Sequence, residues 1–246
     1  MKLSCSVMAH PDRAEYVGQM ITDLGPLGES VPVHWDPEGK ASGNADRVWR
    51  QARSAWGMFS EHADWHVLLQ DDAVPCPDFL EGLALALDHV HGPAIVSGYL
   101  GQGRLVPARW TTLADRAERE GASWIRSNTL MWGVCIALRT VDIPLMIDWA
   151  DRRAAIPDDM RVSGWAKRFE RDVWYTWPSL VDHRPVPSLT KHRAHDRTAR
   201  RLLISSARDV SWSGPVVTDP MVTLRRSGRS GPSVRRQAAQ TKVIGQ

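Results

Sequence analysis

Cysteine is scarce in this chain: Cys5, Cys76 and Cys135 are its three cysteines among 246 residues. They are odd in number and widely separated, which excludes a disulfide framework and a zinc-binding spacing. No apolar run approaches the roughly 18 residues that cross a membrane, and Pro11 ends the N-terminal apolar stretch too early for a signal peptide. We therefore expect a cytoplasmic protein with no membrane partner.

Phenylalanine and tyrosine are also scarce, with three of each, whereas tryptophan occurs twelve times. A tryptophan ring can stack on a nucleobase or on the apolar face of a sugar. Many of the twelve are expected in the core. We expect a stacking role for one or two of Trp110, Trp132 and Trp165.

Charge is unevenly distributed along the chain. Residues 191–246 hold 12 Lys and Arg against 3 Asp and Glu, whereas residues 1–190 hold 19 against 25. A basic segment can bind phosphates, nucleic acid or an acidic surface, although a solvated tail has the same composition. We predict a catalytic domain over residues 1–205 and a basic C-terminal extension over residues 206–246, whose last ~20 residues have the composition of a disordered segment.

Segments with strand and helix periodicity alternate along the chain. The predicted strands are residues 3–8, 31–35, 65–70, 94–97 and 131–138. The predicted helices are residues 12–24, 45–59, 77–90, 144–150 and 163–175, and residues 101–122 are expected to form a loop with a short helix. This alternation predicts an α/β fold with a mixed, mostly parallel sheet that is flanked by helices.

Polar residues follow three of the predicted strands. His10 follows the first strand, Asp36 the second, and the pair Asp71-Asp72 the third. The carboxyl ends of parallel strands lie on one edge of a sheet, and ligands bind at that edge. We therefore expect these side chains to gather around one ligand.

The pair Asp71-Asp72 is the strongest candidate for chemistry. Adjacent carboxylates repel each other unless a cation or a hydrogen-bond donor lies between them. A hard divalent cation such as Mg²⁺ or Mn²⁺ binds carboxylate oxygens and keeps positions open for phosphate. The alternative is structural, with one aspartate capping the helix after Pro77 and the other solvated.

Residues 67–74, Val-Leu-Leu-Gln-Asp-Asp-Ala-Val, followed by Phe79 and Leu80, resemble the Asp-x-Asp region of GT-A-fold glycosyltransferases. The segment is similar in particular to the lipooligosaccharide and collagen galactosyltransferase type, and to glycosyltransferases of actinobacterial phages. Gln70 stands where that family has Glu. The resemblance therefore implies Asp72 as the direct metal ligand and Asp71 as a partner of the nucleotide sugar. It implies a Rossmann-like GT-A fold over roughly residues 3–195.

The resemblance also implies where the donor binds, a nucleoside diphosphate sugar and by preference a UDP-sugar. His10 and Arg13 lie in the first loop, where a helix N-terminus favours an anion. Asp36 corresponds to a contact with the base or the ribose. Arg50, on the second predicted helix, and Lys191 would meet phosphate. Capping, a turn and solvent-facing charges are the alternatives at these positions.

Two further groups follow from the same resemblance. Asp158 and Asp159 come at the start of a helix, where similar enzymes place the acid that takes the acceptor proton; helix capping is the alternative. His183, with His192 and His195 behind it, is the candidate for the last metal ligand, and a surface histidine is the alternative. Carboxylates with one imidazole suit Mn²⁺ or Mg²⁺.

The sequence thus predicts a metal-dependent glycosyltransferase, a hexosyl- or pentosyltransferase, that moves a sugar from its donor to an acceptor hydroxyl. The basic C-terminal segment favours modified double-stranded DNA as acceptor, such as a hydroxymethylated base in phage DNA, in the host cytoplasm. A virion protein or a glycan is the alternative acceptor. The competing classes are a non-catalytic nucleic-acid-binding protein on the same fold and a metal-dependent nucleotidyltransferase.

Overall fold

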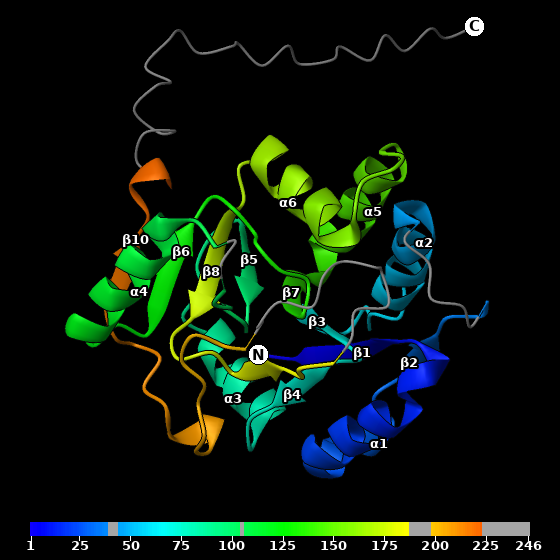
Figure 1. The fold of residues 1–246 in the computed structure, drawn as a ribbon, viewed down its shortest axis with the longest axis horizontal. Coiled ribbons are helices and arrows are strands. Elements are labelled where there is room, and N and C mark those ends of the chain that lie inside the picture. The colour runs from blue at the N-terminus through cyan, green and yellow to red at the C-terminus, as the bar shows by residue number, and fades with distance from the viewer. Residues whose placement is uncertain (39–43, 104–105, 187–197, 223–246) are drawn as a thin grey trace, which may run out of the picture.

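The computed structural model describes residues 1–38, 44–103, 106–186 and 198–222. An eight-stranded sheet with the strand order β10-β6-β8-β5-β7-β3-β1-β2 lies at its centre (Figure 1). Its strands are β1 (Leu3–Ala9), β2 (Val33–Trp35), β3 (Trp65–Gln70), β5 (Ala94–Ser97), β6 (Trp124–Ser127), β7 (Cys135–Arg139), β8 (Asp172–Thr176) and β10 (Val216–Thr218). Among the described residues, four pairings of this sheet are parallel and three are antiparallel, which confirms the predicted mixed α/β fold.

Helices cover both faces of the sheet. The helices are α1 (Ala14–Asp23), α2 (Ala45–Trp56), α3 (Phe79–Leu87), α4 (Ala108–Arg119), α5 (Ile143–Asp151) and α6 (Asp158–Arg168). Helices α1 and α3 pack on one face, and α2, α4, α5 and α6 pack on the other (Figure 1). None of the helices in the described part of the chain is long and apolar enough to cross a membrane.

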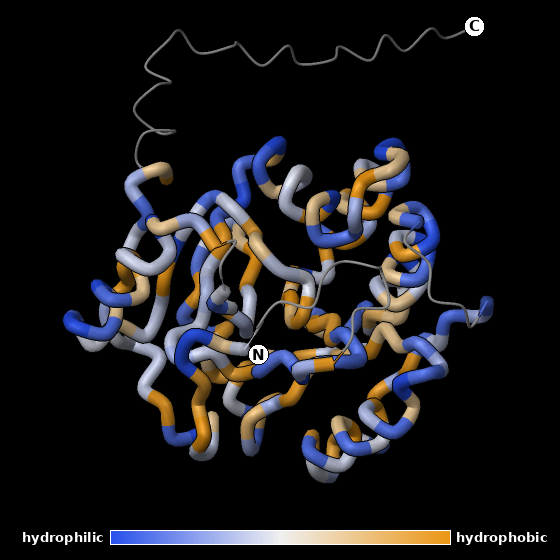
Figure 2. Tube along the Cα trace, viewed as in Figure 1, coloured by the Kyte–Doolittle hydropathy of each residue, from blue (hydrophilic) through white to orange (hydrophobic). Residues whose placement is uncertain are grey.

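Strand β3 is buried from both sides, which explains its continuous apolar sequence. Val67 and Leu69 face the core that α1 and α3 cover, whereas Leu68 faces the opposite core. Figure 2 shows the same pattern for the whole molecule, with apolar residues along the strands and polar residues on the outer sides of the helices. Trp110 and Trp165 are fully buried in the second core, so of the three tryptophans considered for stacking only Trp132 remains a candidate.

A second, two-stranded sheet lies beside the large one. Strand β4 (Ala73–Pro75) pairs in antiparallel fashion with β9 (Val181–His183), so that Ala73 lies opposite His183. Because β4 begins directly after Asp72, this pairing brings a residue from late in the chain to the end of β3.

Residues 163–175 were expected to form one helix, and the structure differs. Helix α6 ends at Arg168, and residues 172–176 form β8, which pairs with β5 and β6. Glu170 adopts a left-handed backbone conformation with a φ of 57°, which stops the helix. Val173 and Tyr175 are buried and the intervening Trp174 is partly exposed, an alternation typical of a strand.

The catalytic domain was expected to end at residue 205, but the fold continues beyond that point. The 3₁₀ helix η4 (Ala207–Asp209) packs on α3, and strand β10 forms the edge of the main sheet beside β6. Trp212 is buried, and its carbonyl accepts a hydrogen bond of 2.9 Å from Nε1 of Trp124. The predicted boundary is therefore wrong, since residues 206–222 complete the core; residues 223–246 lie outside the described residues.

The contact between α3 and η4 tests this correction. A Cβ atom on Gly82 would lie 2.1 Å from the Cβ of Ala207 and 2.6 Å from its carbonyl carbon. We expect Gly82→Ala to lower the free energy of unfolding by about 1–3 kcal/mol, measured by urea denaturation, because backbone would have to move.

Gly18→Ala is the matched control in α1, where a new Cβ meets nothing within 4 Å. Alanine there should raise the free energy of unfolding by about 0.5–1 kcal/mol. The same gain in both variants would contradict the packing of η4 on α3.

Candidate active site

Three parallel strands bring polar residues to one edge of the sheet. Strand β1 lies between β2 and β3, and all three run in the same direction. The backbone N–H of His10, just after β1, donates to Oδ2 of Asp71 at 2.7 Å. The backbone N–H of Asp36, just after β2, donates to the carbonyl of Ala9 at 2.8 Å. These contacts show that the ends of β1, β2 and β3, which carry His10, Asp36 and Asp71, are adjacent.

Arg13 lies between the two adjacent carboxylates. Its Nη1 donates to Oδ1 of Asp71 and to Oδ2 of Asp72, at 2.6 Å each. All three side chains are buried. Arg13 precedes the first residue of α1, so the start of this helix is held against the end of β3. The guanidinium of Arg13 thus supplies positive charge between the two carboxylates.

The two carboxylates respond differently to their surroundings. Burial raises the pKa of Asp71, and the charge of Asp72 adds to the increase, although Arg13 and the His10 N–H oppose it. Burial also acts to raise the pKa of Asp72, but hydrogen bonds and charges from His183 and Arg13 outweigh it and hold that pKa below its usual range. Asp72 therefore stays ionised, as a cation ligand must.

His183 meets Asp72 through the pairing of β9 with β4. Its Nε2 lies 3.3 Å from Oδ2 of Asp72, and the side chain is buried. The ring of Tyr99 lies 6.3 Å from the imidazole and 5.6 Å, edge-on, from the ring of Trp132. The sequence analysis did not identify Tyr99 as a neighbour of this site. Its position two residues after the apolar strand β5 could have indicated it. Trp132 is partly exposed, which suits the stacking role expected for it.

Three buried atoms of this edge have no hydrogen-bond partner among the described residues: Nε2 of His10, Oδ1 of Asp72 and Nδ1 of His183. Buried polar atoms in folded proteins are nearly always hydrogen-bonded, so three such atoms at one edge indicate a site for an ion or a polar ligand. Within the described part of the chain, no group of three or more His, Cys, Asp and Glu could hold a metal. Asp72 and His183 fit a divalent cation whose other ligands come from phosphate and water.

Asp158 is joined to the end of β3 by Gln70. Nε2 of Gln70 donates to Oδ2 of Asp158 at 3.3 Å. A Cβ on Gly133 would lie 2.8 Å from that nitrogen and 3.4 Å from the Cβ of Asp159, so only glycine leaves room for this contact. Burial, helped by the charge of Asp159, raises the pKa of Asp158 to about 7. Oδ1 of Asp159 instead accepts the backbone N–H of Met160 at 2.7 Å, in the first turn of α6.

Arg47 of α2 lies at this edge, whereas Arg50 of the same helix does not. Nη2 of Arg47 donates to Oδ2 of Asp36 at 2.7 Å, and both side chains are buried. Arg50 points elsewhere, and no hydrogen bond or ion pair between described residues joins it to Asp71 or Asp72. Lys191, expected at the phosphates, lies outside the described residues, as do His192 and His195.

No family model and no curated protein matches the sequence. Among solved structures, the chain is similar in fold to Drosophila β1,4-galactosyltransferase 7, seen as a mutant in complex with manganese, UDP-Gal and xylobiose, with a TM-score of 0.44, 10% identity, and coverage of 80% of this chain and 69% of that chain. The catalytic domain of the same enzyme with xylobiose gives a TM-score of 0.44, 10% identity, and coverage of 81% and 70%. At this distance the likeness concerns the course of the chain and assigns no activity.

Replacing Arg13 tests its place between the carboxylates. Arg13→Gln leaves two buried carboxylates without their shared cation, and we expect the free energy of unfolding at pH 7 to fall by about 3 kcal/mol. Arg116→Gln removes an exposed ion pair with Glu120 and should cost less than about 1 kcal/mol. Urea denaturation measures both, and equal losses would contradict the central position of Arg13.

Proposed function

We propose that this protein is a GT-A-type glycosyltransferase that moves a sugar from a nucleoside diphosphate sugar to an acceptor hydroxyl. The observation that carries the proposal is the convergence of Arg13, Asp71, Asp72 and His183 at the carboxyl ends of three parallel strands. Ligands of doubly wound sheets bind at such an edge. The atoms without partners there are a carboxylate oxygen and imidazole nitrogens, which suit a cation and a phosphate.

The donor side of the proposal rests on charge. Asp71, Asp72 and Arg13 together carry a formal charge of −1, so a divalent cation would make the cluster positive and attractive to a diphosphate. His10 and Arg13, beside the start of α1, would face the diphosphate. Asp36, held by Arg47, would accept hydrogen bonds from the ribose or the base of a UDP-sugar. Lys191 is proposed as a further phosphate contact.

Asp72 and His183 would hold Mn²⁺ or Mg²⁺ in this proposal. The bound cation would supply charge that stabilises the departing diphosphate. Arg13 contributes to the same stabilisation, because its guanidinium is fixed by two carboxylates before the donor arrives and needs no reorganisation.

Asp158 is proposed as the general base. A carboxyl with a pKa of about 7 is ionised for part of the time at neutral pH and is then a stronger base than an ordinary aspartate. Gln70 orients it by one hydrogen bond to Oδ2. Proton removal from the acceptor by Asp158 corresponds to direct displacement with inversion at the sugar. Asp159, whose carboxylate is engaged at the helix start, raises the pKa of its neighbour.

The acceptor is the second part of the proposal. The excess of 12 Lys and Arg over 3 Asp and Glu in residues 191–246 favours a nucleic acid, since phosphate contacts of this kind need basic side chains. We therefore propose a hydroxymethylated base in DNA as the acceptor, in preference to a protein or a glycan.

Nucleotide release tests the donor side. The protein, incubated with a panel of UDP- and GDP-sugars and Mn²⁺, is expected to release nucleotide from a UDP-sugar, and EDTA should abolish release. Asp72→Asn should lower the rate at least about 100-fold, because charge stabilisation of the leaving group is lost. Mn²⁺ should also raise the melting temperature of the wild type and not that of Asp72→Asn.

Asp115→Asn, an exposed change on α4, is the control and should behave as the wild type. The donor proposal fails if no sugar nucleotide is consumed, and the metal assignment fails if Asp72→Asn keeps its Mn²⁺-dependent shift.

The pH dependence tests Asp158. Since only the carboxylate accepts a proton, transfer to the acceptor should rise about tenfold per pH unit below pH 7 and level off above it. Asp158→Asn should lower the plateau about 10²–10⁴-fold and remove this limb of the profile.

The same group should affect stability in the opposite sense. Because folding raises its pKa, the proton on Asp158 stabilises the folded state at low pH, and this contribution is lost as the pH rises through about 7. Asp158→Asn should therefore melt at a higher temperature than the wild type at pH 8, in a thermal denaturation series. A variant that is inactive but shows no gain at pH 8 would argue against a partly buried, proton-binding Asp158.

A further inference from the structure

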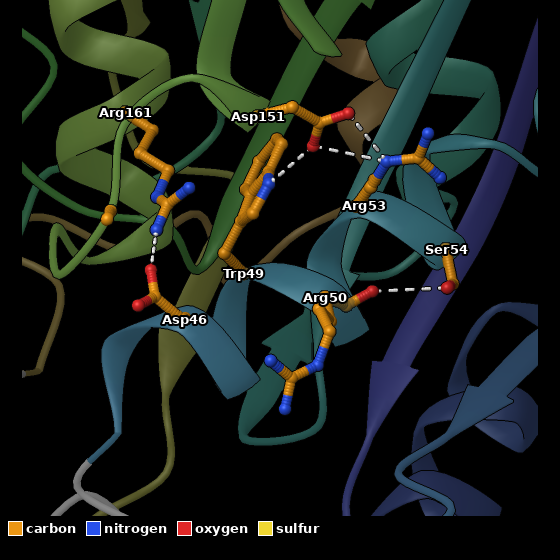
Figure 3. A pocket seen from close by; sticks show the side chains of 8 residues that line it. Asp46, Trp49, Arg50, Arg53, Ser54, Asp151 and Arg161 are labelled. Atoms are coloured by element: carbon orange, nitrogen blue, oxygen red, sulfur yellow. Dashed lines mark hydrogen bonds and ion pairs between the residues drawn. The ribbon is translucent and has the colours of Figure 1, made fainter. Parts of the chain in front are cut away.

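A hollow of about 610 Å³ opens between α2, α5 and α6 (Figure 3). It is lined by Asp46, Trp49, Arg50, Arg53, Ser54, Asp151, Ala154 and Arg161. None of these residues belongs to the edge that gathers Asp71, Asp72 and His183. The hollow is therefore separate from that edge, and its lining carries three arginines against two aspartates.

Both aspartates of the hollow are engaged by the protein itself. Oδ1 of Asp46 accepts the backbone N–H of Ala155 at 2.8 Å and a short hydrogen bond from Arg161. Asp151 accepts Nε1 of Trp49 at 2.8 Å and Nε of Arg53 at 2.9 Å. Figure 3 shows the Trp49 indole between Arg161 and Arg53, with Asp151 above it. Each aspartate is thus paired with an arginine, and the three arginines and two aspartates give the lining a formal charge of +1.

Arg161 uses its donors within the framework, whereas Arg50 and Arg53 each make one ion pair and keep further N–H donors unused. Arg161 is buried and donates to the carbonyls of Ile156 and Ala150 at 2.8 Å and 2.9 Å. Arg53 uses Nε alone, and its two terminal nitrogens make no hydrogen bond within the described chain. The guanidinium of Arg50 makes no hydrogen bond there either, and it forms one ion pair, with Glu38 at 3.7 Å. Their side chains are 64% and 51% exposed, for Arg50 and Arg53.

The hollow adjoins the candidate active site through two helices. On α2, Arg47 faces Asp36, and Arg50 follows one turn later in the hollow. On α6, Asp158 faces Gln70, and Arg161 follows one turn later in the hollow. One helical turn is about 5 Å along the axis. A long acceptor whose hydroxyl lies at Asp158 would therefore reach the hollow with a neighbouring group.

We propose that this hollow binds a backbone phosphate of a nucleic-acid acceptor, a proposal that rests on the proposed function. Two guanidinium groups with unused N–H donors suit a phosphodiester, which accepts several hydrogen bonds at once. The sequence of residues 191–246, with 12 Lys and Arg against 3 Asp and Glu, favours a polyanion over a single phosphate as the ligand of this protein. In this proposal Arg50 contacts a phosphate of the acceptor, in place of the donor phosphate contact expected for it from the sequence.

Binding of DNA without any donor tests the hollow by itself. The full chain is titrated into a short fluorescein-labelled DNA duplex, and anisotropy gives Kd at several salt concentrations. Arg50→Gln/Arg53→Gln should raise Kd about tenfold or more and lower the slope of log Kd against log salt by about 1–2. Arg50→Gln alone, which leaves the Arg53–Asp151 pair intact, should give part of this change.

Arg116→Gln/Arg119→Gln is the matched control, since it removes two arginines at the same spacing from α4, and it should leave Kd and the slope near the wild-type values. Equal changes in both double variants, or in neither, would overturn the proposal. A higher KM for the UDP-sugar with an unchanged Kd for DNA in Arg50→Gln/Arg53→Gln would also overturn it, because Arg50 would then contact the donor. An equal dependence on Arg50 and Arg53 for a polyglutamate peptide would overturn the nucleic-acid assignment. Failure of nucleotide release by the wild type would remove the proposed function, while the DNA titration would still decide what the hollow binds.

Discussion

The ion pair of Arg13 with Asp71 and Asp72 is the constraint on which the rest of the site depends. Two adjacent carboxylates at the end of a buried strand need a positive charge between them to remain ionised. Arg13 supplies that charge from the start of α1 and so fixes this helix to β3. Asp72 also contacts His183 and so connects the cluster to β9. One charge cluster therefore joins α1, β3 and β9, which are far apart in the sequence.

The adjacency of the residues after β1, β2 and β3 could be predicted from the sequence. Parallel strands end at the same edge of a sheet, and the apolar run of residues 65–70 indicated a buried strand. The pairing of Arg13 with Asp71 and Asp72 was not predicted, although Arg13 follows the neighbouring strand β1, because the sequence does not show which way a side chain of that loop points. Strand β8 was missed because the segment before it has helical spacing, and a single left-handed residue, Glu170, separates the two. Strand β10 has only three residues, which is too short for a pattern to reveal.

Five arginines near the strand ends and the hollow fall into two groups with different physical roles. Arg13, Arg47 and Arg161 are buried, and carboxylates and carbonyls fix each of them in one orientation. These residues organise the fold around the strand ends. Arg50 and Arg53 are 64% and 51% exposed. A guanidinium is more weakly hydrated than an ammonium, so it loses less hydration when a ligand replaces water. Side chains of one chemical type thus provide both the rigid frame and the adaptable surface.

The strand order has a consequence for synthesis of the chain. Strand β3 acquires β7 as its second neighbour only after the whole of α3, β5, α4 and β6 has been made, because β7 enters the sheet between β3 and β5. At translation rates of about 5–20 residues per second, one edge of an apolar strand stays open for several seconds on the ribosome. Such an edge is a template for pairing with other chains. Production of this protein should therefore depend on temperature and on chaperones that cover nascent strands.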